Sequence, residues 1–150
     1  MRYADDFIIF AQSKEEIEEV YVILEPYLKD RGLILAEDKT KITTLNEGFN
    51  FLGFNTKMED NEKCIIKPSK ESIKEAKAKI TEVFNYMKGH NVGELISVLN
   101  PVIDGIAEYW KPLCSNEAFK SIDHHIWNRT MIFLKHLHSN KSKGWIISKY

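Results

Sequence analysis

Apolar residues recur at helical spacing in the first part of the chain, directly after a helix-start signal. Ser13 and Glu16 form a capping box, a pair of side chains that satisfies backbone N–H groups at the start of a helix. The inward face of this helix is then expected to hold Ile17, Val20, Tyr21, Leu24, Tyr27 and Leu28. Gly32 is placed to end it, since glycine readily adopts the left-handed backbone that closes many helices.

Residues 68–150 predict three longer helices and a tail. Pro68-Ser69 begins the first, which Gly89 ends; the second runs from about Val92 to Trp110, and the third from about Asn116 to His138. The positions expected inside the first are Ile73, Ala76, Ile80, Val83, Phe84 and Met87. Those expected inside the third are Phe119, Ile122, Ile126, Phe133 and Leu137.

Short apolar runs between turn-forming residues predict strands. Residues 2–11 are expected to form a β-hairpin, and further strands are expected at 33–35, 41–45, 49–58 and 64–67. The fold class is therefore α+β. We expect an antiparallel sheet with one helix in residues 1–67 and a three-helix bundle in residues 68–150.

Composition excludes a membrane protein and a disulfide-rich secreted domain. The chain of 150 residues is 43% hydrophobic and 29% charged, and its mean hydropathy is -0.34. The longest apolar stretch, 95–107, is interrupted by Asn100-Pro101 and Asp104, so it is too short to span a bilayer. Cys64 and Cys114 form no disulfide or zinc pattern. We therefore expect a cytoplasmic protein with no membrane partner.

The net charge of -1 conceals two opposed halves. Residues 1–66 contain 8 Lys/Arg and 14 Asp/Glu, whereas residues 67–150 contain 13 Lys/Arg, 8 Asp/Glu and all 5 histidines. From His124 to the end there is no acidic side chain. An acidic half followed by a basic half predicts two different tasks, the second with an anionic partner.

The string Tyr3-Ala4-Asp5-Asp6 carries the clearest chemistry in the sequence. Mg²⁺ prefers oxygen ligands, and adjacent carboxylates at the tip of a hairpin can supply them. Nucleotidyl transfer uses two divalent ions to activate the attacking hydroxyl and to stabilise the leaving oxygen. An Asp-Asp pair is also a common turn former, so these residues alone leave both interpretations open.

The surrounding residues favour the first interpretation. The chain resembles the group II intron reverse transcriptase/maturase family in a series of blocks that occur in the family's order and cover essentially its whole length. These blocks are Arg2 to Phe7, Gly32 to Leu35 with Lys39-Thr40, Phe49 to Phe54, Ile66 to Ser69, Leu99 to Ile103 with Gly105 and Tyr109, and Trp127-Asn128 with His138, Lys141-Ser142, Trp145-Ile146 and Lys149-Tyr150. Retron-type reverse transcriptases share only the first three blocks.

The resemblance implies a role for each matching residue. Asp5 and Asp6 would be catalytic aspartates that bind Mg²⁺, and Lys39 would lie near the incoming nucleotide. Tyr3 and the segment Phe51, Leu52 and Gly53 would bind the primer end. Residues 1–67 would be the C-terminal part of the polymerase palm, and residues 68–150 the thumb and maturase region called domain X.

The resemblance also implies nucleic-acid partners, namely intron RNA and an RNA/DNA primer-template. Cationic residues of the basic half are the expected RNA contacts: Lys70, Lys74, Lys77, Lys120, Arg129, Lys135, Lys141, Lys143 and Lys149. A lysine stripe on an amphipathic helix is more often only its solvated face, so it is the family context that favours RNA binding. The sequence leaves the oligomeric state open.

Three hypotheses for the function follow. The chain is a fragment of an RNA-directed DNA polymerase, a splicing cofactor that binds RNA without polymerase activity, or a decayed remnant of either. In the family, the fingers and another metal-binding aspartate precede the Asp5-Asp6 motif. We therefore expect these 150 residues alone to lack polymerase activity and to retain RNA binding.

Overall fold

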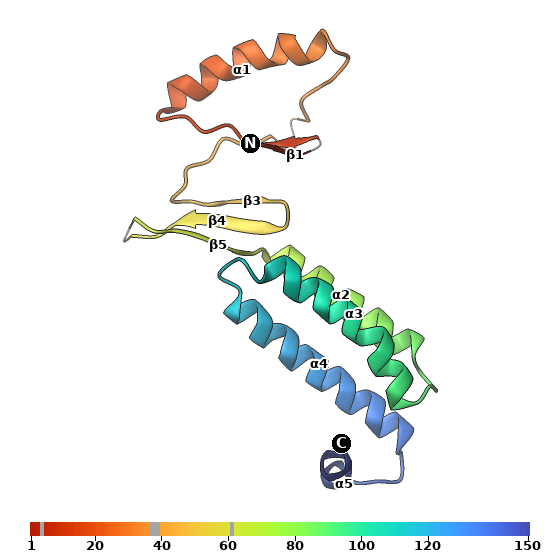
Figure 1. Ribbon diagram of the computed structural model, residues 1–150. Coiled ribbons are helices and arrows are strands. Elements are labelled where there is room, and N and C mark those ends of the chain that lie inside the picture. The colour runs from red at the N-terminus through yellow and green to blue at the C-terminus, as the bar shows by residue number, and fades with distance from the viewer. Residues whose placement is uncertain (4, 37–39, 61) are drawn as a thin grey trace. The chain divides into compact units, whose positions relative to one another are not determined.

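The computed structural model describes residues 1–3, 5–36, 40–60 and 62–150 (Figure 1). The chain divides into two compact units, Met1–Thr44 and Leu45–Tyr150, and each is described by itself. The described residues contain helices and two antiparallel sheets, which confirms the α+β class.

The first unit contains a small hairpin and one helix. Strands β1 (Arg2–Tyr3) and β2 (Asp6–Phe7) pair antiparallel and are shorter than the predicted hairpin of residues 2–11. Helix α1 (Lys14–Lys29) has the predicted capping box: Ser13 Oγ accepts from the Glu16 backbone N–H at 3.3 Å. Gly32 follows with φ of +71°, as expected of a residue that closes a helix.

No described residue of Met1–Thr44 is buried. The predicted inner face of α1 is half-buried except for Tyr27, whose exposed fraction is 53%. The strands predicted at 33–35 and 41–45 do not form, and Ile34 in the first of them is 92% exposed. The Leu45 carbonyl accepts from the Met58 N–H at 2.8 Å, but a strand needs a ladder of such hydrogen bonds, and among the described residues neither segment belongs to a sheet.

The second unit begins with a three-stranded sheet in the order β3-β4-β5. The predicted strand region 49–58, in which the resemblance implies a hairpin at residues 51–54, consists of two strands, β3 (Phe49–Phe51) and β4 (Phe54–Met58), joined by a tight turn. Leu52 and Gly53 at the turn have φ of 49° and 77°, values that reverse the chain within two residues. Strand β5 (Cys64–Pro68) pairs back on β4, as predicted.

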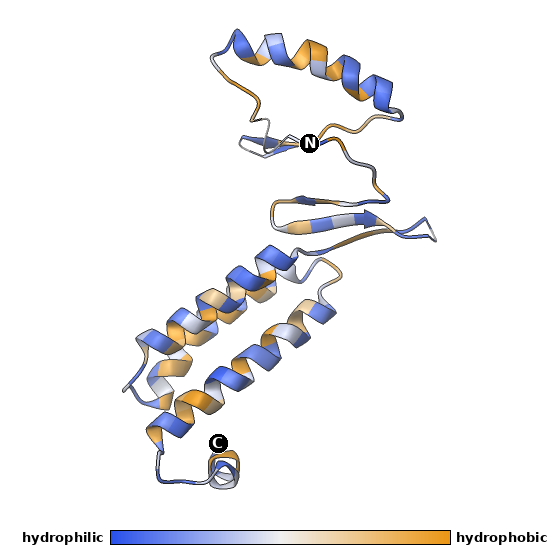
Figure 2. Ribbon diagram, turned by 180° about the vertical axis from the view of Figure 1, so that it is seen from behind, coloured by the Kyte–Doolittle hydropathy of each residue, from blue (hydrophilic) through white to orange (hydrophobic). Residues whose placement is uncertain are grey.

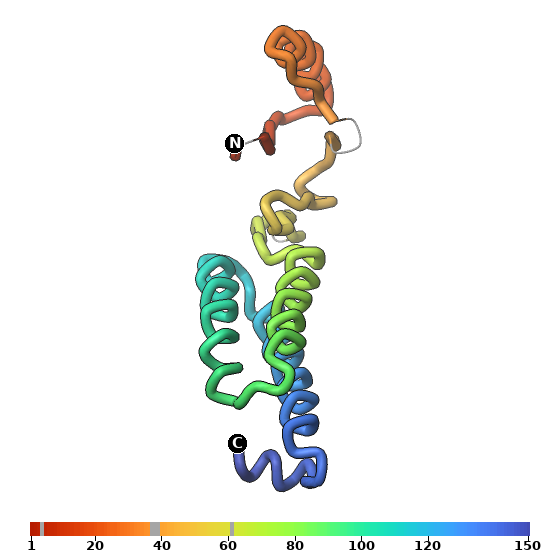
Figure 3. The backbone as a smooth tube through the Cα atoms, turned by 90° about the vertical axis from the view of Figure 1, so that its right-hand side faces the viewer, coloured from red at the N-terminus to blue at the C-terminus, as the bar shows by residue number. Residues whose placement is uncertain are grey.

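Three helices follow the sheet and run alongside one another (Figures 1 and 3). They are α2 (Lys70–Tyr86), α3 (Val92–Trp110) and α4 (Asn116–Leu137), close to their predicted bounds. Ser69 and Asn91 cap the first two by accepting backbone N–H groups. A short helix, α5 (Lys143–Lys149), occupies what the sequence predicts as a tail.

The helices enclose a hydrophobic core. Figure 2 shows apolar and polar residues side by side along α2, α3 and α4. The core consists of Ala76, Ile80, Phe84, Met87, Leu95, Leu99, Trp110, Ala118, Ile122, Phe133, Leu134 and Ile146. All six positions predicted inside α2 are buried or packed against this core. Leu137, predicted inside α4, is 38% exposed instead and is the last residue of that helix.

Candidate functional site

The two predicted catalytic aspartates lie on the small hairpin of the first unit. Tyr3 pairs with Asp6, and Arg2 pairs with Phe7. Met1 and Ile8 extend the pairing through two backbone hydrogen bonds of 2.8 Å. Tyr3, Asp5 and Asp6 are all exposed, so the hairpin presents both carboxylates to solvent.

The chemistry of these side chains fits a magnesium ligand set, because adjacent carboxylates are hard oxygen donors. Lys39, the predicted nucleotide contact, lies outside the described residues. Across the described residues, no group of three or more His, Cys, Asp or Glu side chains is arranged to hold a metal ion. The described residues therefore hold two adjacent carboxylates on one hairpin and no arranged metal site.

The predicted primer-binding residues form the turn between β3 and β4. The Leu52 carbonyl accepts from Tyr109 Oη at 2.8 Å, and the Gly53 carbonyl accepts from the Ser69 N–H at 2.9 Å. The Phe54 and Tyr109 rings lie 4.9 Å apart between centroids. These contacts attach the turn to the ends of α2 and α3. Sequence reasoning missed the role of Tyr109, since no local pattern indicates a contact 57 positions away.

An open hollow of about 290 Å³ lies beside this turn. It is bounded by Asn50, Phe51, Leu52 and Gly53 on the sheet side, and by Ser69, Glu71, Ser72 and Glu75 on the helix side. A methyl group on Gly53 would come within 3.3 Å of Ser72 Oγ. The two glutamates make the hollow acidic.

Some of the predicted RNA contacts are already engaged within the protein. Lys120 Nζ donates to Glu117 Oε1 at 2.8 Å, and this hydrogen bond raises the pKa of Lys120 and lowers that of Glu117. Lys135 Nζ donates to the carbonyls of Ser139 and Lys141. These two lysines therefore help to fix local structure.

Lys77 and a neighbouring histidine form part of the packing between α2 and α4. Lys77 Nζ donates to Ser121 Oγ at 2.8 Å. The Thr81 hydroxyl donates to the Lys77 carbonyl, so it accepts from His125 Nε2 at 2.9 Å, which places the imidazole proton on that nitrogen. Burial and the nearby Lys77 charge lower the pKa of His125. The half-buried Lys77 is thus less accessible to RNA than the sequence indicates.

Lys70, Lys74 and Lys143 are exposed, and no ion pair holds them among the described residues. Lys70 and Lys74 occupy the first turns of α2, one turn apart. Of the predicted RNA contacts, Lys70, Lys74 and Lys143 are the most available to phosphate groups.

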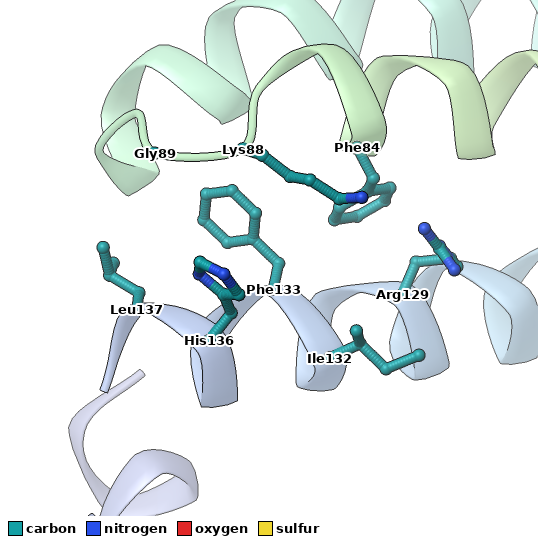
Figure 4. Close-up of a pocket in the computed structure, with 8 residues that line it drawn as sticks. All are labelled: Phe84, Lys88, Gly89, Arg129, Ile132, Phe133, His136 and Leu137. Carbon is teal, nitrogen blue, oxygen red and sulfur yellow. The ribbon is translucent and has the colours of Figure 1, made fainter. Parts of the chain in front are cut away.

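A small apolar hollow with a basic rim lies between the end of α2 and α4 (Figure 4). Its volume is about 50 Å³, and Phe84, Ile132, Phe133 and Leu137 contribute apolar surface to it. Lys88, Arg129 and His136 contribute nitrogen atoms. Arg129 donates to Asn85 Oδ1 at 3.1 Å, while its Nε is buried and has no hydrogen-bond partner within the described part of the chain. Among the residues that the structure describes, no acidic side chain borders this hollow.

The last thirteen residues gather aromatic and cationic groups around Trp145. Lys141 and Lys149 lie 5.2 and 5.0 Å from the centroid of its ring. His138 contacts the Trp145 ring and also hydrogen-bonds Tyr150 Oη at 2.9 Å. Trp145 and Lys149 are four residues apart within α5 and therefore share one face, a spacing that the sequence shows, whereas Lys141 lies before the helix.

Two protein-family models match parts of the chain. Residues 73–150 match the model described as group II intron, maturase-specific domain. The chain belongs to the group II intron maturase family. Residues 1–56 match the model described as reverse transcriptase (RNA-dependent DNA polymerase). No curated protein matches the chain.

Membership of this family gives the two units of the chain their general context. The Asp5-Asp6 hairpin and the β3–β4 turn both lie in the reverse transcriptase match, and α3, α4 and α5 lie in the maturase match. Reverse transcriptases generally use Mg²⁺, and nucleic acids such as intron RNA are the partners of both families. None of the described helices is long and apolar enough to cross a membrane.

Proposed function

We propose that the maturase helices of this chain bind intron RNA, and that the Asp5-Asp6 hairpin serves RNA-directed DNA synthesis as part of a larger polymerase active site. The observation that carries the proposal is the maturase match over an independently packed helical unit whose last 27 residues contain no acidic side chain. The earlier division into a palm part, 1–67, and a domain X part, 68–150, remains part of this proposal.

RNA binding by the helical unit follows from its charge. Lys70, Lys74 and Lys143 are exposed and available to neutralise phosphates, and Lys141 and Lys149 add charge at the end of the chain. Such contacts release counterions from the RNA, so affinity should fall steeply as salt rises. Lys77, Lys120, Arg129 and Lys135 have partners within the protein and would contribute less.

The test uses the purified 150-residue chain and a labelled group II intron RNA. Fluorescence anisotropy at about 50 and about 200 mM salt should show binding at the lower value and a loss of at least about tenfold at the higher one. Absence of binding at the lower salt by a chain that is helical by circular dichroism would refute RNA binding.

The proposed role of the hairpin is to hold Mg²⁺. Bound at Asp5 and Asp6, the metal would supply charge that activates the primer hydroxyl and stabilises the leaving oxygen. Tyr3, on the same hairpin, and the turn Phe51–Gly53 would position the primer end. Because two exposed carboxylates form an incomplete ligand set, we expect no extension by the 150 residues alone.

A primer-extension assay tests this second role. The chain alone should give no template-dependent product, whereas co-expression with a reverse transcriptase segment that supplies fingers and the further aspartate should restore extension. Asp5→Asn should then abolish the restored activity, because it removes a negative ligand without changing side-chain size. Template-dependent synthesis by the purified chain alone would contradict the expectation.

A further inference from the structure

We infer that Trp145 and the groups around it form a stacking site for an unpaired RNA nucleotide. The site, here called the Trp145 cluster, consists of His138, Lys141, Trp145, Lys149 and Tyr150. The inference rests on the proposed RNA binding and goes further, since it names which part of an RNA is recognised and by which side chains.

The Trp145 and Tyr150 rings are partly exposed to solvent. Trp145 is 37% exposed and Tyr150 is 54% exposed, although Trp145 lies within α5 and Tyr150 ends it, and this helix is well packed at Ile146. Ile146 is completely buried in the core and anchors α5 to the bundle. The rings are therefore held on a fixed support while part of their surface faces solvent. Such exposed, immobilised aromatic rings are what unpaired bases stack upon.

Contacts with His138 fix the orientation of the Trp145 and Tyr150 rings. The His138 ring lies 5.2 Å from that of Trp145 and 5.7 Å from that of Tyr150. The hydrogen bond of 2.9 Å between His138 Nε2 and Tyr150 Oη joins the end of α4 to the end of α5. A pre-ordered cluster loses little side-chain entropy when a ligand binds.

Two positively charged side chains lie close to the rings of the cluster. Lys141 and Lys149 lie within 5.2 Å of the Trp145 ring centroid, and Lys149 lies 5.4 Å from that of Tyr150. Cation–π contacts at exposed sites are weak, so a base can displace an ammonium group from the ring. Each displaced ammonium group then lies within reach of the phosphate of the same nucleotide. No acidic side chain occurs after Asp123 to oppose this.

The ligand implied by these groups is a nucleotide whose base is not paired. In an RNA duplex, base faces are stacked on each other and the rings of the cluster would find only ribose and phosphate. The cluster should therefore distinguish single-stranded RNA from duplex RNA, whereas the lysines of α2 should not.

The chain offers a matched control in Trp127, which lies on α4 and is 50% exposed. No lysine or second ring is found against the Trp127 ring among the described residues. If exposure of a tryptophan were sufficient for stacking, the two residues would behave alike.

The experiment measures binding of a labelled 12-nucleotide oligo(U) and of a 12-base-pair blunt RNA duplex at low salt. Trp145→Leu keeps apolar bulk on α5 and removes the aromatic face, while Trp145→Phe keeps an aromatic face. We expect Trp145→Leu to weaken oligo(U) binding about fivefold or more and to change duplex binding less than about twofold. Trp145→Phe should retain most of the affinity, and Trp127→Leu should match the unaltered chain.

Three outcomes would overturn the inference. The first is that Trp145→Leu and Trp127→Leu weaken oligo(U) binding equally. The second is that Trp145→Leu weakens oligo(U) binding and duplex binding equally. The third is that the unaltered chain binds intron RNA but not oligo(U). Failure of the unaltered chain to bind any of these RNAs would instead refute the proposed function, and with it this site.

Discussion

The two units of this chain contain the same kind of helix but reach different degrees of burial. Helix α1 has a complete capping box and an apolar face, yet none of its residues is buried. Helix α2 has a similar N-cap, and Ala76, Ile80 and Phe84 on its apolar face are buried against α3 and α4. Local signals are thus sufficient to place a helix, whereas stability depends on a second apolar surface to pack against.

Core truncation should give the largest difference between the units. Ile80→Ala removes a fully buried side chain from α2 and should cost about 2–5 kcal/mol in the free energy of unfolding. Ile23→Ala removes a side chain that is 72% exposed on α1 and should change that free energy by less than about 0.5 kcal/mol. Chemical denaturation followed by circular dichroism measures both. Similar costs would show that α1 is packed as tightly as α2.

Removal of the helix caps should give a smaller difference. Ser69 is 3% exposed and accepts from the Ser72 N–H, so Ser69→Ala should cost about 1–2 kcal/mol. Ser13 makes the equivalent hydrogen bond in an exposed position. Ser13→Ala should loosen α1 locally and leave the main unfolding transition in place. A shift of that transition by Ser13→Ala as large as that by Ser69→Ala would mean that the two units unfold together.

Lowering the pH should destabilise the helical unit through protonation of His125. Burial and the Lys77 charge lower the pKa of His125 in the folded chain, so the unfolded chain binds its proton first as the pH falls. The contribution of neutral His125 to the free energy of unfolding is complete above its unfolded-state pKa of about 6.5. It is lost as the pH falls through the lowered pKa of the folded state. His125→Gln should therefore reduce the loss of stability between about pH 7.5 and pH 5 in urea titrations. An unchanged loss in this variant would assign it to other groups.

Most of the helical architecture could be predicted from the sequence. Apolar spacing and capping residues gave the bounds of α1 to α4 to within a few positions, because these signals are local. Helix α5 was missed, since its seven residues contain less than two full turns of pattern. The strands predicted at 33–35 and 41–45 had the right composition, but a strand also requires a neighbour that no local pattern supplies.

The candidate site was predictable only in part. The aspartate hairpin was recognised because its residues are contiguous. The hairpin at residues 51–54 was expected from the family resemblance, but the left-handed backbone of Leu52, with φ of 49°, and its contact with Tyr109 far along the chain were not. Likewise, the internal partners of Lys77 and Arg129 are on other helices, so the sequence could not separate them from the more available Lys70 and Lys74.

The most direct test of the account asks which unit carries RNA affinity. The double variant Lys70→Glu/Lys74→Glu reverses two exposed charges on α2, and Lys14→Glu/Lys29→Glu reverses two on α1. Anisotropy with group II intron RNA at low salt should show a loss of about tenfold or more for the first pair and less than about twofold for the second. An equal loss for both pairs, or a larger loss for the α1 pair, would contradict the assignment of RNA binding to the maturase helices.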